Sequence, residues 1–176
     1  EDVLACFDPL GNATHTALSF DLTGEDVLVT GAGPIGVMSV AIARHRGARY
    51  VVITDFNDYR LRLASAMGAD MAVNLADSSI DEAMRALGMK EGFDGGFEMS
   101  GSPAGQATAW GLLDKGGYLA VVGYTPDKVE LRLSNLMAFD ATARGNWGCP
   151  PEWYPAVLDL VVSGGVRLAE FVEKRP

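Results

Sequence analysis

Cysteine and histidine are scarce in this sequence. The 176 residues contain two cysteines, Cys6 and Cys149, which lie far apart and belong to no CxxC pair. This spacing excludes a disulfide framework and gives no zinc signature, so each thiol is expected to pack as a small hydrophobe. The histidines, His15 and His45, are isolated, and two isolated histidines do not make a metal site. We therefore predict that this chain itself binds no metal.

Positive charge is scarce as well. The chain carries 14 Lys and Arg residues against 23 Asp and Glu residues, which gives a formal net charge of −9. Binding to nucleic-acid phosphates needs a clustered positive surface, and the sequence contains no block of Lys and Arg. We therefore predict no nucleic-acid partner.

Long hydrophobic runs are the third feature that the sequence lacks. Its apolar runs are short and interrupted by Gly, Asp or Arg, so none could span a bilayer. No secretory signal pattern stands at the start. Together with the scarcity of cysteine, this predicts a cytoplasmic protein with no membrane partner. Because the chain starts with Glu1 and not with Met, we expect it to be a piece of a longer protein.

The chain does show a regular alternation of short β-rich runs with segments of helical spacing. Such alternation predicts parallel strands with right-handed crossovers, and hence an α/β fold with a doubly wound parallel sheet. In the segment 34–45, Ile35, Met38 and Ile42 form a predicted apolar stripe, with the small Ser39 on the same face. We expect strands at 26–30, 50–54, 71–75, 93–99, 118–122 and 141–146, and helices at 12–20, 34–45, 58–67, 79–87, 103–113 and 152–162.

The strongest local motif is Gly31-Ala-Gly33-Pro-Ile-Gly36, which follows a predicted strand and opens a predicted helix. In this context the pattern is a dinucleotide-binding fingerprint. Gly31 permits the tight turn, Gly33 lets the backbone approach a pyrophosphate, and Gly36 lets the helix pack closely on the strand. Pro34 fits the first helical turn, where its missing N–H costs nothing. The alternative is a glycine-rich turn that binds no ligand.

An acid at the end of the second strand indicates which dinucleotide is bound. Asp55 follows Gly36 by 19 residues, and an acid about 20 residues after the fingerprint binds the adenosine ribose hydroxyls and repels a 2′-phosphate. This predicts NAD over NADP. Arg60 could bind such a phosphate, but beside Asp55 we expect it to pack against the adenosine or to pair with the acid. A solvated helix charge is the alternative for Arg60.

Further contacts are expected at the carboxyl ends of the other strands, because open α/β sheets bind ligands there. Ser100-Gly101, the run Val122-Gly123-Tyr124, and Asn146-Trp147 lie at those predicted ends. For each of these segments, a plain loop is an equally good interpretation.

Four runs carry a family resemblance: residues 7–17, 31–36, 53–60 and 92–101. They resemble the zinc-dependent medium-chain alcohol dehydrogenases, in particular their L-threonine-oxidising branch, and only the Rossmann NAD-binding domain of that family. The resemblance runs to about residue 123 and loosely to residue 148, and the segment Cys149–Pro155 departs from it. It implies that Ile35, Asp55, Arg60, residues 122–124, Asn146 and Trp147 contact NAD.

The resemblance also implies a role for Asp8, as an acid beside the catalytic zinc of the complete enzyme. From the sequence alone Asp8 is an acid before Pro9 near a helix start, so capping of that helix is the rival interpretation. The family's zinc ligands would lie upstream of this chain, and none has a counterpart in it.

The implied organisation has three parts. Residues 1–22 are a lead-in segment from a missing catalytic domain, residues 23–165 the Rossmann domain, and residues 166–176 a tail that leads back toward the missing domain. The implied activity is NAD-linked oxidation of a small secondary alcohol, with the 3-hydroxyl of L-threonine as the leading substrate. A polyol or other secondary alcohol, or a non-catalytic NAD-sensing module, is the alternative. The resemblance further implies a homo-oligomer, dimer or tetramer, with residues 131–139 as the candidate contact.

Overall fold

Six parallel strands form one sheet, described here for residues 2–171 from a computed structural model. The strand order is β3-β2-β1-β4-β5-β6, and all five neighbouring pairs are parallel. This confirms the doubly wound α/β class, and the strand order reverses between β1 and β4. The strands are β1 (Asp26–Thr30), β2 (Tyr50–Asp55), β3 (Met71–Asn74), β4 (Phe93–Glu98), β5 (Leu113–Val121) and β6 (Thr142–Gly145).

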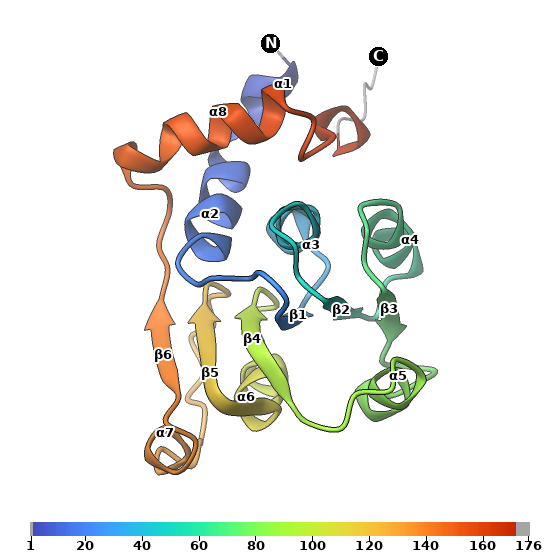
Figure 1. Cartoon of the computed structure of the whole chain (residues 1–176), viewed down its shortest axis with the longest axis vertical. Helices are drawn as coiled ribbons and strands as arrows, with labels where there is room; N and C mark the ends of the chain where they lie inside the picture. The colour runs from blue at the N-terminus through green and yellow to red at the C-terminus, as the bar shows by residue number, and fades with distance from the viewer. Residues whose placement is uncertain (1, 172–176) are drawn as a thin grey trace.

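Helices cover both faces of the sheet (Figure 1). On one face lie α2 (Phe7–Ala17), α3 (Pro34–His45) and α4 (Asp58–Ala66), and on the other α5 (Ile80–Ala86) and α6 (Pro103–Gly111). The helix α8 (Tyr154–Val162) packs against α2, on the side away from the sheet. The remaining elements are α1 (Asp2–Ala5), α7 (Asn135–Ala138), and the 3₁₀ turns η1 (Pro151–Trp153) and η2 (Leu168–Phe171).

The neighbouring strands β1 and β2 are buried along almost their whole length. Every residue of β1 is buried, as are the four residues that follow Tyr50 in β2. Their near-continuous runs of Val, Leu and Ile are typical of parallel strands covered on both faces. In the part of the chain that the structure describes, we find no helix with the length and apolar character needed to cross a membrane.

The predicted apolar stripe on α3 is part of a wider buried surface, in which Met38, Ile42 and Ser39 are buried as expected. All residues from Gly36 to Ala43 are buried, because α3 packs against β1 and β2 and also against α2, which lies beside it on the same face of the sheet. Ser39 is buried with its hydroxyl donating to the Ile35 carbonyl at 2.9 Å. The surrounding helix therefore satisfies this polar group without a partner from elsewhere.

Several element boundaries also differ from those expected. The lead-in helix runs from Phe7 to Ala17, not from Asn12 to Phe20, and Ser19 ends it by donating its hydroxyl to the His15 carbonyl at 2.6 Å. Strand β5 begins at Leu113, where helix α6 was expected to continue, because Leu113 pairs with Phe93. The short helix α7 was not expected. Of the expected tail, residues 166–176, the part from 172 to 176 lies outside the described residues.

Candidate cofactor-binding site

A pocket of about 460 Å³ lies at the carboxyl ends of β1, β2 and β4. This is the edge of the sheet at which the strand order reverses, where doubly wound sheets bind dinucleotides. Of the predicted site residues, Gly31, Gly33, Asp55, Arg60 and Ser100 line this pocket together. The structure thus brings into one hollow residues that are spread over some 70 positions of the sequence.

The geometry of the three motif glycines agrees with their predicted tasks. Gly31 has φ of +93°, and a Cβ there would lie 2.7 Å from the Cα of Ser100. A Cβ at Gly36 would lie 2.0 Å from the Gly31 carbonyl oxygen. Around Gly33, in contrast, a Cβ would meet no atom within 4 Å. Gly31 and Gly36 are therefore required by the fold itself, whereas Gly33 borders open space on the pocket.

The first turn of α3 leaves amides available at this open space. Gly33 is the N-cap residue of α3 and Pro34 is in the first turn, with no side chain capping the helix among the described residues. The unpaired amides and the positive end of the helix dipole make such a helix start a binding site for anions. The space beside Gly33 thus fits the pyrophosphate of a dinucleotide.

Asp55 is more engaged with the backbone than the sequence indicated. Its Oδ2 accepts from the Ala32 amide at 2.7 Å, and its Oδ1 accepts from the Phe56 and Asn57 amides at 2.8 and 2.9 Å. A carboxylate offers about four acceptor positions, so the side chain keeps little free capacity for a ligand. Asp55 therefore ties the glycine turn to the end of β2 in addition to facing the pocket.

Arg60 lines the same pocket but forms no ion pair with Asp55 within residues 2–171. Its backbone amide donates to the side chain of Asn57, which caps α4. Of the three interpretations of Arg60 given above, pairing with the acid is not found among residues 2–171. Packing against the adenosine stays a prediction.

The sequence did not reveal that one wall of the pocket comes from the start of α6. Ser102, the N-cap of α6, accepts from the Gly105 amide at 3.0 Å. The placement of α6 against β1 and β4 depends on the crossover that follows β4, which no local pattern encodes. The lining residues that were not predicted are Thr30, Thr54, Phe56, Leu75, Met99, Ser102, Ala104, Gly105 and Thr108.

The other predicted contacts lie outside this pocket. Ile35 is half-buried, Tyr124 and Trp147 are strongly exposed, and Val122 and Gly123 follow the end of β5. Asn146 is buried, and its amide nitrogen donates to the Ser19 hydroxyl at 3.2 Å. Ile35 belongs to the first turn of α3, whereas the other five residues lie at the carboxyl ends of β5 and β6, beside the pocket and not within it.

Asp8 lies on the first turn of α2, away from this pocket. The N-cap position of α2 is Cys6, and no side-chain capping bond is present there in the described part of the chain. Asp8 is exposed, so the structure does not support helix capping by its side chain. Burial, followed by the charges of Asp8 and Glu152, raises the pKa of Cys149, which places this acid near that thiol.

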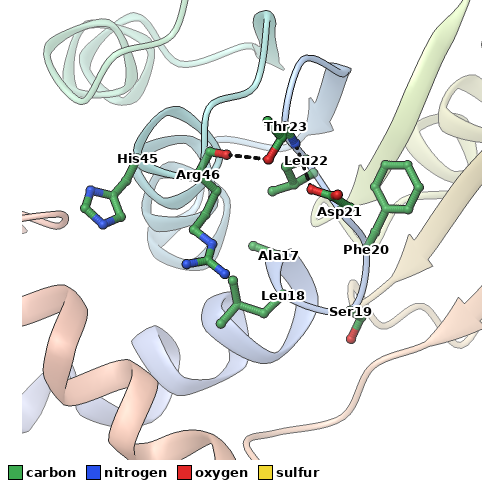
Figure 2. Close-up of a pocket in the computed structure, with 9 residues that line it drawn as sticks. All are labelled: Ala17, Leu18, Ser19, Phe20, Asp21, Leu22, Thr23, His45 and Arg46. Atoms are coloured by element: carbon green, nitrogen blue, oxygen red, sulfur yellow. Dashed lines mark hydrogen bonds between the residues drawn. The ribbon is translucent and has the colours of Figure 1, made fainter.

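A larger hollow of about 580 Å³ lies at the opposite edge of the sheet, between the end of α2 and the end of α3 (Figure 2). Its wall is mainly the connection from Leu18 to Thr23, held by a bond from the Thr23 amide to Asp21 at 3.1 Å. That amide lowers the pKa of Asp21. The side chains of His45 and Arg46, which also line this hollow, are exposed. We therefore place the candidate site at the other, carboxyl edge.

Within residues 2–171, no group of three or more His, Cys, Asp or Glu side chains is arranged to hold a metal ion. His15 is buried, with its Nδ1 at 3.0 Å from the Gly148 carbonyl oxygen, and so has a structural role. The described residues therefore do not fit a zinc ion.

The fold and the carboxyl-edge pocket define a Rossmann-type domain. A family model described as zinc-binding dehydrogenase matches residues 34–163. The chain belongs to this family, the zinc-dependent medium-chain alcohol dehydrogenases.

The curated relatives of the chain include L-threonine 3-dehydrogenases. That of Anaeromyxobacter dehalogenans is 49% identical over 177 residues and that of Pseudoalteromonas atlantica 47% over 174 residues. The alignments cover 99% and 98% of this chain but 51% of each relative. The chain thus spans about half the length of the curated relatives it matches.

Solved structures give the same result for the fold. The alcohol dehydrogenase of Thermus sp. ATN1 matches with a TM-score of 0.88 and 26% identity, over 97% of this chain and 50% of that one. L-idonate 5-dehydrogenase of Escherichia coli matches with a TM-score of 0.83 and 28% identity, over 96% and 48%. An alcohol dehydrogenase of Escherichia coli CFT073 complexed with NADH has a TM-score of 0.85 at 22% identity, over 97% and 50%.

Proposed function

We propose that residues 23–165 are the cofactor-binding domain of a zinc-dependent, NAD-linked dehydrogenase that oxidises a secondary alcohol. The observation that carries this proposal is the pocket lined by the Gly31–Gly33 turn and Asp55. Residues 1–22 and 166–176 would then join this domain to a catalytic domain outside the chain. The greater length of the curated relatives supports that division.

Each part of the pocket has a task in this proposal. The amides at the start of α3 bind the pyrophosphate, Asp55 accepts from a ribose hydroxyl, and Arg60 packs along the adenosine. The residues at the carboxyl ends of β4, β5 and β6 hold the other half of the cofactor in line with the substrate. When bound, the nicotinamide supplies a ring that accepts a hydride. The remaining residues to which we assign contacts with the cofactor are Pro34, Ile35, Ser100, Val122, Gly123, Tyr124, Asn146 and Trp147.

We infer that zinc is held by residues outside this chain, since the described residues hold no ligand cluster. Asp8 would serve as a proton-carrying acid near that site, which its exposure and lack of a capping bond in the described part of α2 support. Elemental analysis tests the first part of this inference. One tightly held zinc ion per purified 176-residue chain would contradict it.

L-Threonine, oxidised at its 3-hydroxyl, is the proposed substrate of the complete enzyme, because the curated relatives above are L-threonine 3-dehydrogenases. The similarity to L-idonate 5-dehydrogenase favours a polyol or related secondary alcohol as the second candidate. Values of kcat/KM for L-threonine and for polyols, measured on the longer protein that carries this chain, separate the two. A higher kcat/KM for a polyol would contradict L-threonine as the substrate and favour the polyol.

We also propose a homo-oligomer that uses residues 131–139 and the neighbouring edge strand β6. All four residues of β6 are exposed, and Leu133 and Met137 are 70% and 79% exposed. An open strand edge with apolar side chains beside it is a surface that proteins usually cover. Sedimentation equilibrium of the chain tests this proposal, and a monomer at all concentrations would contradict it.

The open space at Gly33 gives a sharp test of the cofactor assignment. Gly33 has φ of −68°, which alanine also adopts, and a Cβ there meets no protein atom within 4 Å. Gly33→Ala should therefore leave the fold intact, while its methyl group occupies the space assigned to the pyrophosphate. We expect NADH affinity, measured by fluorescence titration, to fall at least about tenfold, which is 1.4 kcal/mol of binding free energy.

Gly111→Ala is the matched control. Gly111 is also free of atoms within 4 Å of its Cβ position, but it ends α6 and lies outside the pocket. This variant should bind NADH as the parent chain does. Undiminished NADH binding by Gly33→Ala would remove the glycine turn from the cofactor site.

A further inference from the structure

A buried carboxylate lies beneath the carboxyl edge of the sheet and has no task in the function proposed above. Glu98 is the last residue of β4, between β1 and β5, and is 0% exposed. No Lys, Arg or His nitrogen lies within 4 Å of it among residues 2–171. Burying an acid without a cation is costly, so this position calls for a reason beyond packing.

The hydrogen bonds to the Glu98 side chain all reach one of its two oxygens. Its Oε1 accepts from the Thr30 hydroxyl at 3.3 Å, the Ser100 amide at 2.9 Å and the Ser100 hydroxyl at 2.5 Å. The Gly101 amide donates to the same oxygen at 3.2 Å. All of these partners can donate. Its Oε2 has no hydrogen-bond partner within the described chain.

Glycine backbone approaches both oxygens of this carboxylate from the cofactor edge, beside the Ser100 hydroxyl. A Cβ at Gly123 would lie 2.6 Å from Oε2, and a Cβ at Gly105 would lie 3.0 Å from Oε1. Gly105 lines the pocket, and Gly123 follows the end of β5. The negative charge of Glu98 therefore lies directly below the half of the edge, beyond the reversal of strand order, that would receive the nicotinamide.

We propose that Glu98 is a specificity-determining residue that favours NAD⁺ over NADH. The proposal rests on the cofactor assignment made above. The two cofactors differ by the positive charge of the oxidised nicotinamide ring, so a fixed negative charge below that ring stabilises the oxidised form selectively. For unit charges about 12 Å apart at an effective dielectric constant of about 20, Coulomb's law gives a factor of about ten in relative affinity.

The test is the ratio of the two dissociation constants, Kd for NAD⁺ divided by Kd for NADH, measured by calorimetry on the 176-residue chain. In Glu98→Gln this ratio should rise about tenfold, which a purely structural role would not produce. Glu98→Met is a second variant without the charge, and although it leaves the donors to Oε1 unpaired, it should give the same rise. Glu98→Asp keeps the charge and should keep the parental ratio even if both affinities fall.

Glu91→Gln is the matched control, because it removes the same charge from an exposed residue near the opposite end of β4. Its ratio should equal that of the parent. An unchanged ratio in the neutral Glu98 variants would overturn the proposal. The proposal would also be overturned if, of the three Glu98 variants, only Glu98→Asp folds, because the charge would then serve the fold. If the parent chain binds neither cofactor, the cofactor assignment fails instead.

Discussion

For Asp8 the sequence left two roles open, helix capping and proton transfer beside a zinc site, and the structure argues against capping. It stands two positions after Cys6, the N-cap of α2, and makes no capping bond in the described part of the chain. An acid in the first helical turn still gains from the helix dipole, by about 0.3–1 kcal/mol. Helix capping therefore no longer accounts for Asp8, and its proposed role in proton transfer can be tested without confusion with folding.

Asp8→Asn in the longer protein that carries this chain should lower kcat by about 10²–10⁴, the usual effect of losing a positioned acid or base. The melting temperature and the affinity for NAD⁺ should change little, because the amide keeps the shape of the carboxylate. Glu152→Gln is the control, since Glu152 is a second acid near Cys149, and it should keep full turnover. Full turnover in Asp8→Asn would exclude Asp8 from the mechanism.

At this scale the sequence predicted the residues whose roles depend on local backbone geometry. Gly31 and Gly36 are required by a turn and by close packing that the motif itself specifies. The backbone bonds of Asp55 and the position of Glu98 were not predicted, because they depend on how β1, β2 and β4 align in space. An acid at the end of an apolar strand was the one signal that could have drawn attention to Glu98.

At the scale of elements, the start of α5 has the most complete local signal. Ser79 accepts from the Glu82 amide at 3.3 Å, and Glu82 accepts from the Ser79 amide at 2.9 Å. The Ser79 amide and then its hydroxyl lower the pKa of Glu82. A lowered pKa in the folded state means stabilisation that is present at neutral pH and lost as the pH falls through that lowered value.

Ser79→Ala should lower the free energy of unfolding by about 1 kcal/mol, and hence the melting temperature by roughly 2–4 °C. The difference from the parent should shrink as the pH falls through the lowered pKa of Glu82 and this carboxylate becomes protonated. Ser78→Ala, which removes a hydroxyl that bonds only the Asn74 carbonyl, should cost less. A destabilisation by Ser79→Ala that is no larger than that of the control would contradict a capping role.

The elements that were predicted well and those that were not differ in what determines them. The order and type of the strands and main helices follow from periodicity and glycine stops, so β1 and α3 have the predicted bounds. The environment of α3 does not follow, because α2 reaches it from a different part of the chain. Likewise β5 begins early because Leu113 pairs with Phe93.

At the scale of the whole molecule, the proposed function makes this chain one half of an enzyme. Apolar side chains are left exposed on the side of α2 and α8, where Leu158 is 53% and Val162 86% exposed. A catalytic domain outside the chain would cover such a surface. The pocket within the chain should bind NAD(H) through the glycine turn and Asp55, whatever domain adjoins it.

Titration of the 176-residue chain with NADH and with NADPH in parallel tests whether the pocket binds NAD(H) and prefers it to NADP(H). NADH should bind more tightly, because Asp55 repels a 2′-phosphate. Asp55→Ala should narrow the preference by roughly 1–3 kcal/mol, the cost of losing one charged hydrogen-bonding group. Asp58→Ala, which removes a nearby acid outside the pocket, should leave it unchanged. Equal or tighter binding of NADPH by the unmodified chain would contradict the assignment.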